Sequence, residues 1–178
     1  MDRQIRRVVT GETSEGKSVF THDEVVHPVG MGGGSQWYGV WGWDETPALP
    51  FHRPEPFEQR SVFPGSRPAG GTRINLCVFP PGYGVVADGE PPSEDFLRLA
   101  SAEPAGMHDD GTGMHRTDTL DLCVLVSGEI TVLQHDGAEV TLHPGDLLVQ
   151  NGAMHSWQNR GDVPCEVYIV NVGTARTA

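Results

Sequence analysis

The stretch that decides the fold is MHRTDTLDLCVLVSG, residues 114–128. Polar side chains occupy every second position of its first half, at His115, Thr117, Thr119 and Asp121. Successive side chains of a β-strand point to opposite faces, so this spacing predicts that the four share one face. Apolar residues continue the strand on both faces, which predicts a place in the middle of the fold. A polar face on such a strand indicates an internal cavity rather than a solvated surface.

A second segment of the same character is GDLLVQNGAMHSWQN, residues 145–159. Its first part predicts a strand over 146–150, and the Asn-Gly pair that follows predicts a turn. The next strand is expected to carry His155, Trp157 and Asn159 on one face, because these residues also alternate. The two segments therefore place histidines on two strands that we expect to line the same interior.

Short strands separated by turns also run through the rest of the chain from residue 72. They are predicted over residues 72–79, 120–126, 129–135, 139–143 and 165–172. Asp136 and Gly137 predict the tight turn of a hairpin. One short helix is expected over residues 93–101, where Ser93 caps the first turn. The pattern predicts an all-β fold, a small barrel of the jelly-roll type with room inside for one ligand.

The chain divides by pattern into an N-terminal extension of strands and loops, residues 1–71, and the barrel, residues 72–178. In the extension, a strand over 36–43 is expected to carry three aromatic rings on one face, Trp37, Trp41 and Trp43. These rings fit a core or a subunit seam better than a lid over a ligand. Residues 44–71 are rich in Pro and Gly and predict a long loop. The extension is expected to pack on the barrel, on a partner subunit, or on both.

Composition excludes several classes of partner. The 178 residues carry 12 Lys and Arg against 24 Asp and Glu, a net charge of −12. This argues against binding to nucleic acid or to an anionic membrane, both of which require clustered cations. No apolar run approaches the roughly 20 residues of a membrane span, and the first residues lack the apolar segment of a signal peptide. We therefore expect a cytoplasmic protein, with buried thiols rather than disulfides at Cys77, Cys123 and Cys165.

The two quoted segments resemble the paired motifs of the cupin superfamily, G-x5-H-x-H-x3,4-E-x6-G and G-x5-P-x-G-x2-H-x3-N. The matching positions are His115, Asp121 and Gly128 in the first motif and Gly145, His155 and Asn159 in the second. The resemblance covers residues 106–173. It departs from the pattern at Thr117, which replaces the second histidine, and at Asp121, which replaces a glutamate. The second motif has Asn-Gly in place of P-x-G.

The resemblance implies that a metal is an open question. In cupins three histidines and a carboxylate hold Fe, Mn, Ni, Cu or Zn, and only His115, Asp121 and His155 remain here. Two histidines and one carboxylate suffice to bind Fe(II) with open positions. The resemblance thus leaves open either one divalent metal (Fe, Zn, Mn or Ni) on these three residues or none. It also implies a homodimer.

Three functions remain open. The first is a lyase or isomerase that moves protons on a small aromatic or keto-acid metabolite, by decarboxylation, dehydration or cyclisation. There His115 and His155 would act as acid and base, because histidine titrates near neutral pH, and Asp121 would orient one of them. Substrate contacts are expected from Thr117, Thr119, Trp157 and Asn159. The second function is an Fe(II)-type dioxygenase, and the third is a barrel that binds a small ligand without turnover.

Overall fold

The computed structural model describes residues 3–49, 70–85, 90–101, 107–110 and 112–177. Most of the long loop expected over residues 44–71 lies outside these described residues. Within them all regular structure is β-strand apart from one helix, α1 (Glu94–Ser101). No helix of the described part is long and apolar enough to cross a bilayer. The prediction of an all-β fold with one short helix is confirmed.

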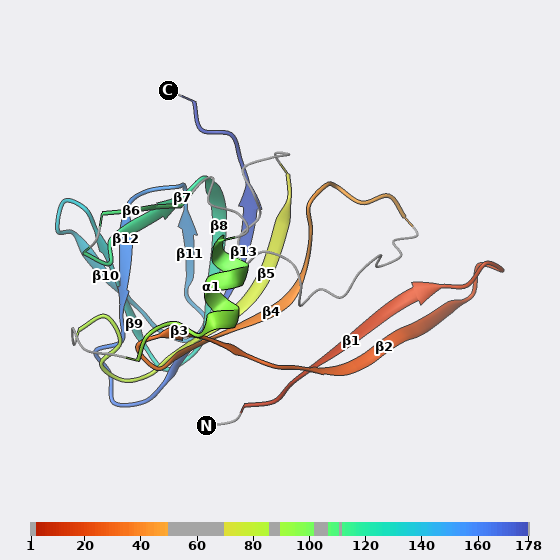
Figure 1. The fold of residues 1–178 in the computed structure, drawn as a ribbon, viewed down its shortest axis with the longest axis horizontal. Helices are drawn as coiled ribbons and strands as arrows, with labels where there is room; N and C mark the ends of the chain where they lie inside the picture. Colours follow the sequence, from red (N-terminus) through yellow and green to blue (C-terminus); the bar gives the residue numbers. More distant parts are fainter. Residues whose placement is uncertain (1–2, 50–69, 86–89, 102–106, 111, 178) are drawn as a thin grey trace.

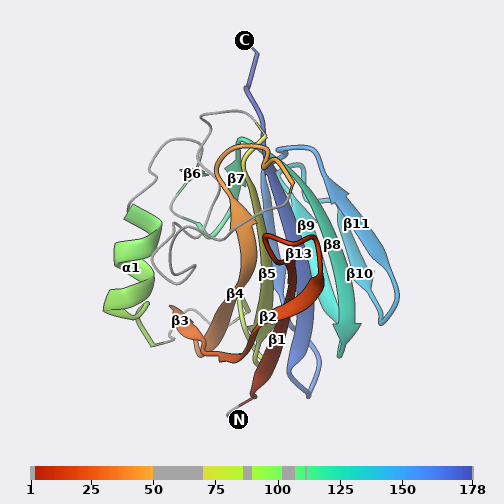
Figure 2. The same cartoon turned by 90° about the vertical axis from the view of Figure 1, so that its right-hand side faces the viewer.

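Two sheets face each other and enclose the core (Figures 1 and 2). The larger sheet has six strands, in the order β11 (Leu147–Gln150), β8 (Thr119–Ser127), β13 (Cys165–Gly173), β5 (Thr72–Phe79), β4 (Ser35–Trp43) and β3 (Val29–Gly32). The smaller has five, in the order β10 (Glu139–Leu142), β9 (Ile130–Gln134), β12 (His155–Gln158), β7 (His115–Thr117) and β6 (Met107–Asp109). Neighbouring strands are often distant in sequence, as where β13 lies between β5 and β8. This is the arrangement of a jelly-roll barrel.

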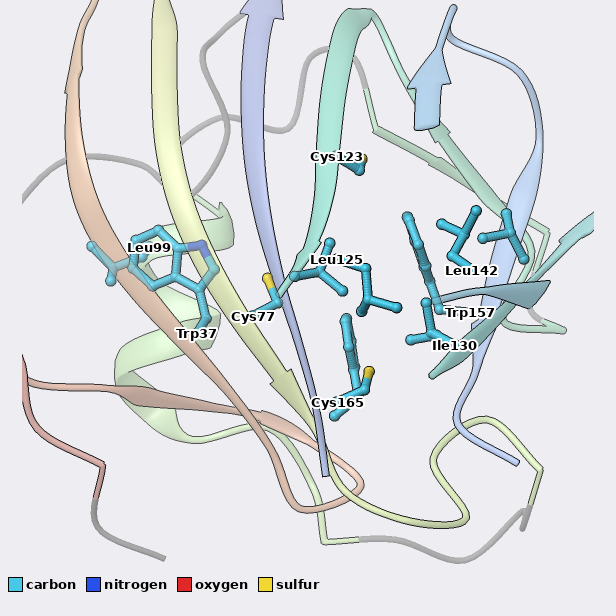
Figure 3. Packing of buried hydrophobic residues seen from close by; sticks show 12 residues of the cluster. Trp37, Cys77, Leu99, Cys123, Leu125, Ile130, Leu142, Trp157 and Cys165 are labelled. Atoms are coloured by element: carbon cyan, nitrogen blue, oxygen red, sulfur yellow. The ribbon is translucent and has the colours of Figure 1, made fainter. Parts of the chain in front are cut away.

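The core lies between the two sheets (Figure 3). Its largest cluster combines Cys77, Cys123 and Leu125 from the six-stranded sheet with Ile130 and Trp157 from the other sheet. All three cysteines of the chain are buried and free of disulfides, as the sequence predicts. Close packing of such side chains between two sheets supplies the main stabilising term of a sandwich or barrel.

The period-two pattern of residues 119–126 is confirmed along β8. Thr119, Asp121, Cys123 and Leu125 are buried, and the residues between them are exposed or half-buried. The strand begins directly after Asp118, where the chain leaves the five-stranded sheet for the six-stranded one. Of the four alternating polar residues, His115 and Thr117 therefore lie on the five-stranded sheet, and Thr119 and Asp121 lie on the six-stranded sheet.

The prediction that three tryptophans share one face of β4 is wrong. A β-bulge lies between Gly39 and Trp41, and it shifts the pairing with β5 by one residue. Trp37 pairs with Cys77 and points into the core, whereas Trp41 pairs with Ile74 and lies on the outer face. An extra residue in one strand reverses the alternation beyond it, and nothing in the local sequence marks the position.

The chain begins with a hairpin of β1 (Ile5–Glu12) and β2 (Ser18–Val26), which forms a separate two-stranded sheet. Figure 1 shows it extending away from the barrel. Strands β3 and β4 also precede residue 72 but pair within the six-stranded sheet, so the domain division at residue 72 remains a prediction. Helix α1 starts as expected, because the Ser93 hydroxyl accepts a hydrogen bond from the Phe96 amide at 3.1 Å.

Gly128, which precedes β9, is expected to tolerate no side chain. Its φ is +72°, and an ideal Cβ would lie 2.7 Å from the carbonyl oxygen of Pro164 and 2.8 Å from Cα of Cys165. Gly128→Ala should therefore lower the free energy of unfolding by about 3 kcal/mol or more in urea titrations. The matched control is Gly137→Ala, with φ +85° but no atom within 4 Å of the new Cβ. It should cost only about 1 kcal/mol, and equal losses in the two variants would refute the steric explanation.

Candidate active site

Two histidines form the centre of the candidate site. His115 on β7 and His155 on β12 are direct cross-strand partners, and their ring centroids lie 4.6 Å apart. Nδ1 of His115 lies 3.2 Å from the carbonyl oxygen of Gly113, and Nδ1 of His155 lies 2.9 Å from that of Ala153. A carbonyl oxygen only accepts, so Nδ1 is the donor in both bonds. In a neutral ring this leaves the lone pair on Nε2, ready to take a proton or bind a metal.

The environment of His155 keeps its ring neutral near pH 7. Burial and the nearby charge of His115 lower the pKa of His155 to about 4, against a smaller opposing effect of the Ala153 carbonyl. The ring is 5% exposed, and Trp157 packs edge-on against it with centroids 5.6 Å apart. His155 therefore has the protonation state that a general base requires.

Asp121 lies on the opposite sheet, on the buried face of β8. Its carboxylate accepts a hydrogen bond of 2.8 Å from Nδ2 of Asn171. Burial raises the pKa of Asp121, while hydrogen bonds from Thr119 and Asn171 and the charge of His115 act in the opposite direction. Thr117 and Thr119 are joined by a 2.5 Å bond between their hydroxyls. The four polar residues of the first quoted stretch thus lie around the junction of the two sheets.

Sequence reasoning missed the asparagines that support Asp121. Nδ2 of Asn75 on β5 donates to Oδ1 of Asn171 on β13 at 2.9 Å, and Asn171 donates in turn to Asp121. Gln150 on β11 is the direct cross-strand neighbour of Asp121 and is only 4% exposed. The available signal was a polar residue, Asn171 on β13 or Gln150 on β11, on an inward strand face that is otherwise apolar. Its meaning depends on which strands are neighbours.

A C-terminal arginine holds the two strands that carry the histidines. Nε of Arg176 donates to the Asp118 carboxylate at 2.6 Å. Its Nη2 donates to the carbonyl oxygens of Thr117 at 3.3 Å and Gly152 at 3.0 Å. Thr117 and Asp118 lie at the end of β7, and Gly152 lies in the turn that leads to β12. One guanidinium therefore connects the corner after His115 with the turn before His155.

Trp157 and Asn159, the two remaining residues predicted to contact substrate, both already have partners within the protein. Trp157 stacks on Phe79 with centroids 6.2 Å apart and also touches the His155 ring. Asn159 is fully buried, and its amide donates to the carbonyl oxygens of Phe79 and Val163, both at 2.9 Å. Both amide hydrogens of Asn159 are therefore used in fixing the chain. Its expected contact with substrate remains a prediction, without a donor left for it.

Two hollows on the described surface lie away from the histidines. One, about 760 Å³, is bordered by Arg7, Val40 and Trp41, between the hairpin and the outer face of β4. The other, about 290 Å³, lies beside Asp118 and Arg176. The geometry of the buried polar groups is therefore the observation on which the candidate site rests.

The predicted three-donor metal set does not form among the described residues. In this part of the chain no three His, Cys, Asp or Glu side chains come together around one point. His115 and His155 offer two Nε2 atoms on one sheet, but the Asp121 carboxylate is bound to Asn171 on the other sheet. The two histidines thus provide two donors, and the set of two histidines and one carboxylate remains a prediction.

Comparison with known proteins identifies the domain. The family model for the cupin domain matches residues 105–171. The chain is 35% identical over 89 residues to "Phomopsin biosynthesis cluster protein C'" of Diaporthe leptostromiformis, covering 50% of this chain and 42% of that protein. It is 33% identical over 51 residues to "Cupin-domain-containing oxidoreductase srdB" of Neurospora crassa, covering 29% of this chain and 26% of that protein. The chain therefore spans less than half the length of these curated relatives.

The chain is also similar to solved structures with which it shares little sequence. A Cupin 2 conserved barrel domain protein from Salinispora arenicola is 14% identical, with a TM-score of 0.42 over 81% of this chain and 80% of that one. A predicted oxalate decarboxylase from Thermotoga maritima is 15% identical, with a TM-score of 0.44 over 83% and 92%. The family match over residues 105–171 and the two facing sheets agree with the resemblance to the cupin superfamily seen in the sequence.

Removing the His155 imidazole is expected to change how stability depends on pH. The pKa is about 4 in the folded protein and about 6.5 in the unfolded chain, so the unfolded chain binds the proton first as pH falls. This contribution to stability is complete above about pH 6.5 and is lost towards pH 4, by about 2–3 kcal/mol. The free energy of unfolding, measured in urea, should fall less between pH 7 and pH 4.5 for His155→Gln than for the wild type. Equal losses would contradict the low pKa of His155.

Proposed function

We propose that the chain is an enzyme that transfers protons on a small aromatic or keto-acid metabolite, with lyase or isomerase chemistry. The observation that carries the proposal is the pairing of His155, which burial keeps neutral, with His115 at a centroid distance of 4.6 Å. Catalytic sites commonly place two titratable groups side by side in environments that separate their proton affinities. The cupin domain supports a small-molecule site in the same part of the chain.

In the proposed reaction, Nε2 of His155 removes a proton from the carbon next to a substrate carbonyl. The electron pair of the broken C–H bond shifts into the carbon skeleton and onto the carbonyl oxygen, which gives an enolate. His115 in its protonated form donates a proton to that oxygen. To complete an isomerisation, His155 gives its proton to another carbon while the enol oxygen returns its proton to His115 and the carbonyl re-forms. To complete an elimination, the enol oxygen likewise returns its proton to His115 as the carbonyl re-forms, and the leaving group departs with the proton held by His155. Positioned acids and bases of this kind contribute about 10²- to 10⁴-fold each.

Asp121 would act through charge. The charge of His115 favours the ionised form of Asp121, because opposite charges at short range stabilise each other. Thr119 and Asn171 hold the carboxylate in place, so they support Asp121 rather than contact substrate. Trp157, edge-on to His155, is the proposed apolar contact for a ring-shaped substrate. Three buried thiols without disulfides agree with the reducing cytoplasm proposed as the location.

A proton-exchange experiment tests the reaction class without the natural substrate. We expect the protein to accelerate deuterium incorporation in D₂O next to the carbonyl of at least one member of a panel of β-keto and aryl keto acids, followed by ¹H NMR. His155→Gln should slow the enzymatic rate about 100-fold or more, because it removes the base and retains a polar side chain.

The matched control for this experiment is His143→Gln, at an exposed position between β10 and β11. It should leave the exchange rate unchanged. Exchange that is equal in wild type and His155→Gln would refute the assignment of the base. Binding of a panel compound without any acceleration would support the third function, a barrel that holds a ligand without turnover.

A metal-dependent dioxygenase is the second candidate, and the two Nδ1-to-carbonyl bonds favour it. Such bonds to a backbone carbonyl typically orient histidines that bind a metal through Nε2. For the proton-transfer enzyme, protein purified without a His tag should contain less than about 0.1 equivalent of metal, and chelators should leave exchange unchanged. About one equivalent of Fe, Zn, Mn or Ni by mass spectrometry, lost in His155→Ala, would favour the dioxygenase instead.

A further inference from the structure

Three buried polar atoms on the inner face of the six-stranded sheet lack a partner. They are Oδ1 of Asn75 on β5, Nε1 of Trp37 on β4 and Nε2 of Gln150 on β11, and none of them has a hydrogen-bond partner within the described part of the chain. The three residues are only 2%, 5% and 4% exposed. A buried polar group without a partner destabilises a folded protein, so each one calls for an explanation. Together these atoms offer one acceptor and two donors to a bound molecule.

The Asn75 atom is an acceptor because of a directional chain of hydrogen bonds. An ionised carboxylate can only accept, so Asn171 turns its Nδ2 toward Asp121, at 2.8 Å. The Oδ1 atom of Asn171 then faces Asn75, which donates to it from Nδ2 at 2.9 Å. Rotating the Asn75 amide would bring two oxygens together without a proton between them. Asn75 therefore presents an oxygen that needs a donor, which a ligand would supply as a hydroxyl or N–H group.

Trp37 lies next to this acceptor on the neighbouring strand. It pairs with Cys77 (Figure 3), so it is the diagonal neighbour of Asn75 on the same face. Diagonal neighbours lie about 7–8 Å apart, within reach of an aromatic side chain. Gly39, directly opposite Asn75, places no side chain in between. A hydroxyl can donate to Asn75 and accept from the Trp37 N–H at the same time, so it is the group that fits here.

Gln150 lies at the other side of the same face, beside Asp121. Two strands, β13 and β8, separate β5 from β11, so Asn75 and Gln150 are about 14 Å apart across the strands. The side chains between them in the row of Asn75 are apolar, because Ile169 pairs with Asn75 on one side and with Cys123 on the other. The face therefore has a polar group at each end and an apolar floor, which suits an aromatic ring with a polar group at both ends.

Arg73 is the cation of this face, and it is already paired. It lies opposite Asn171 and donates to the Asp44 carboxylate at 2.6 Å and to the Trp43 carbonyl oxygen at 2.9 Å. A carboxylate placed against this face would meet the buried charge of Asp121, and like charges at short range repel. Uncharged polar groups on the ligand are therefore favoured.

We infer that this face recognises the substrate, and that the substrate is an uncharged hydroxylated aryl ketone with hydrogen on the carbon next to its carbonyl. The carbonyl oxygen accepts from Gln150, and the ring covers Ile169 and Cys123. The hydroxyl lies between Trp37 and Asn75. The inference rests on the proposed function, because the carbonyl at Gln150 is the group on which the histidines act.

The neighbours of Gln150 place the carbonyl end of the substrate. Asp121, its direct cross-strand partner, lies close enough to His115 for the charge of that ring to act on the pKa of the carboxyl. Gln150 is thus at the end of the face that is nearest the histidines, where the proposed reaction needs a carbonyl. Of the aromatic and keto-acid substrates proposed above, the aromatic class fits this face.

Stability measurements test the unpaired atoms without any ligand. Gln150→Met keeps the size of the side chain and removes the buried donor, so the urea midpoint of unfolding should stay the same or rise. The matched control is Asn171→Leu, which should lower the midpoint because the Asp121 carboxylate loses its donor. A lower midpoint in Gln150→Met would show that this side chain serves the fold, and it would overturn the proposal.

Binding of three small probes, followed by NMR titration, tests the recognition. The wild type should bind 4-hydroxyacetophenone about tenfold or more tightly than acetophenone, which lacks the hydroxyl, or 4-methylphenol, which lacks the carbonyl. Gln150→Met should weaken binding of 4-hydroxyacetophenone about tenfold and leave that of 4-methylphenol unchanged. Trp37→Phe should weaken binding of both hydroxylated probes and leave that of acetophenone unchanged. Gln158→Met, at a position that alternates with the buried residues of β12, should change none of the three.

The outcomes separate this inference from the proposed function. If Trp37→Phe fails to fold, Gln150→Met carries the test. Equal affinity of the wild type for the three probes, or no binding of any, overturns the inferred substrate class. His155→Gln should keep the preference for 4-hydroxyacetophenone, because it leaves this face intact. A wild type that shows the preference but catalyses no deuterium exchange refutes the proposed function alone, and exchange with equal binding of the probes refutes the recognition face alone.

Discussion

The burial of the Asp121 carboxylate imposes the arrangement of the polar half of this barrel. A buried charge is costly unless hydrogen bonds replace its water, and Asp121 is only 6% exposed. The bonds come from Asn171 directly and from Asn75 through Asn171, so three strands of the six-stranded sheet must keep one register. A one-residue slip of β13 against β8 would turn Asn171 outward and leave the carboxylate without its donor.

The same register divides the interior into two parts. Along β8, Thr119 and Asp121 precede Cys123 and Leu125, so the inward face changes from polar to apolar within four alternate positions. On β5 the polar Asn75 likewise precedes the apolar Cys77 and Phe79. Both β5 and β8 pair antiparallel with β13, so the polar ends of β5 and β8 lie at the same edge of the sheet. The apolar part packs the two sheets together, whereas the polar part faces the histidines. The packed core and the candidate site therefore lie at different ends of the same sheet.

The positions of the two histidines are set by strand pairing in the five-stranded sheet. They are neighbours because β7 pairs with β12 through His115 and His155, and the ring orientations follow from backbone carbonyls two residues before each. Arg176 joins the corner after β7 to the turn before β12 from outside. Backbone geometry sets the tautomer, and burial sets the charge of His155. The tautomer and the neutral charge of His155, the proposed base, thus follow from the fold rather than from its neighbours in sequence.

The sequence by itself determined the local features: the strand alternation over residues 119–126, the turn at Gly137, the cap at Ser93 and the two cupin motifs. These follow from short-range periodicity and turn chemistry, which a linear chain displays. Only the tertiary structure decided the bulge that puts Trp37 and Trp41 on opposite faces of β4. It also decided the chain of hydrogen bonds from Asn75 through Asn171 to Asp121. The same packing leaves Asp121 outside any three-donor group with the histidines among the described residues. Each of these depends on pairing between strands that are distant in sequence. Register across such strands is set by the packing of both sheets at once, so periodicity within one strand does not reveal it.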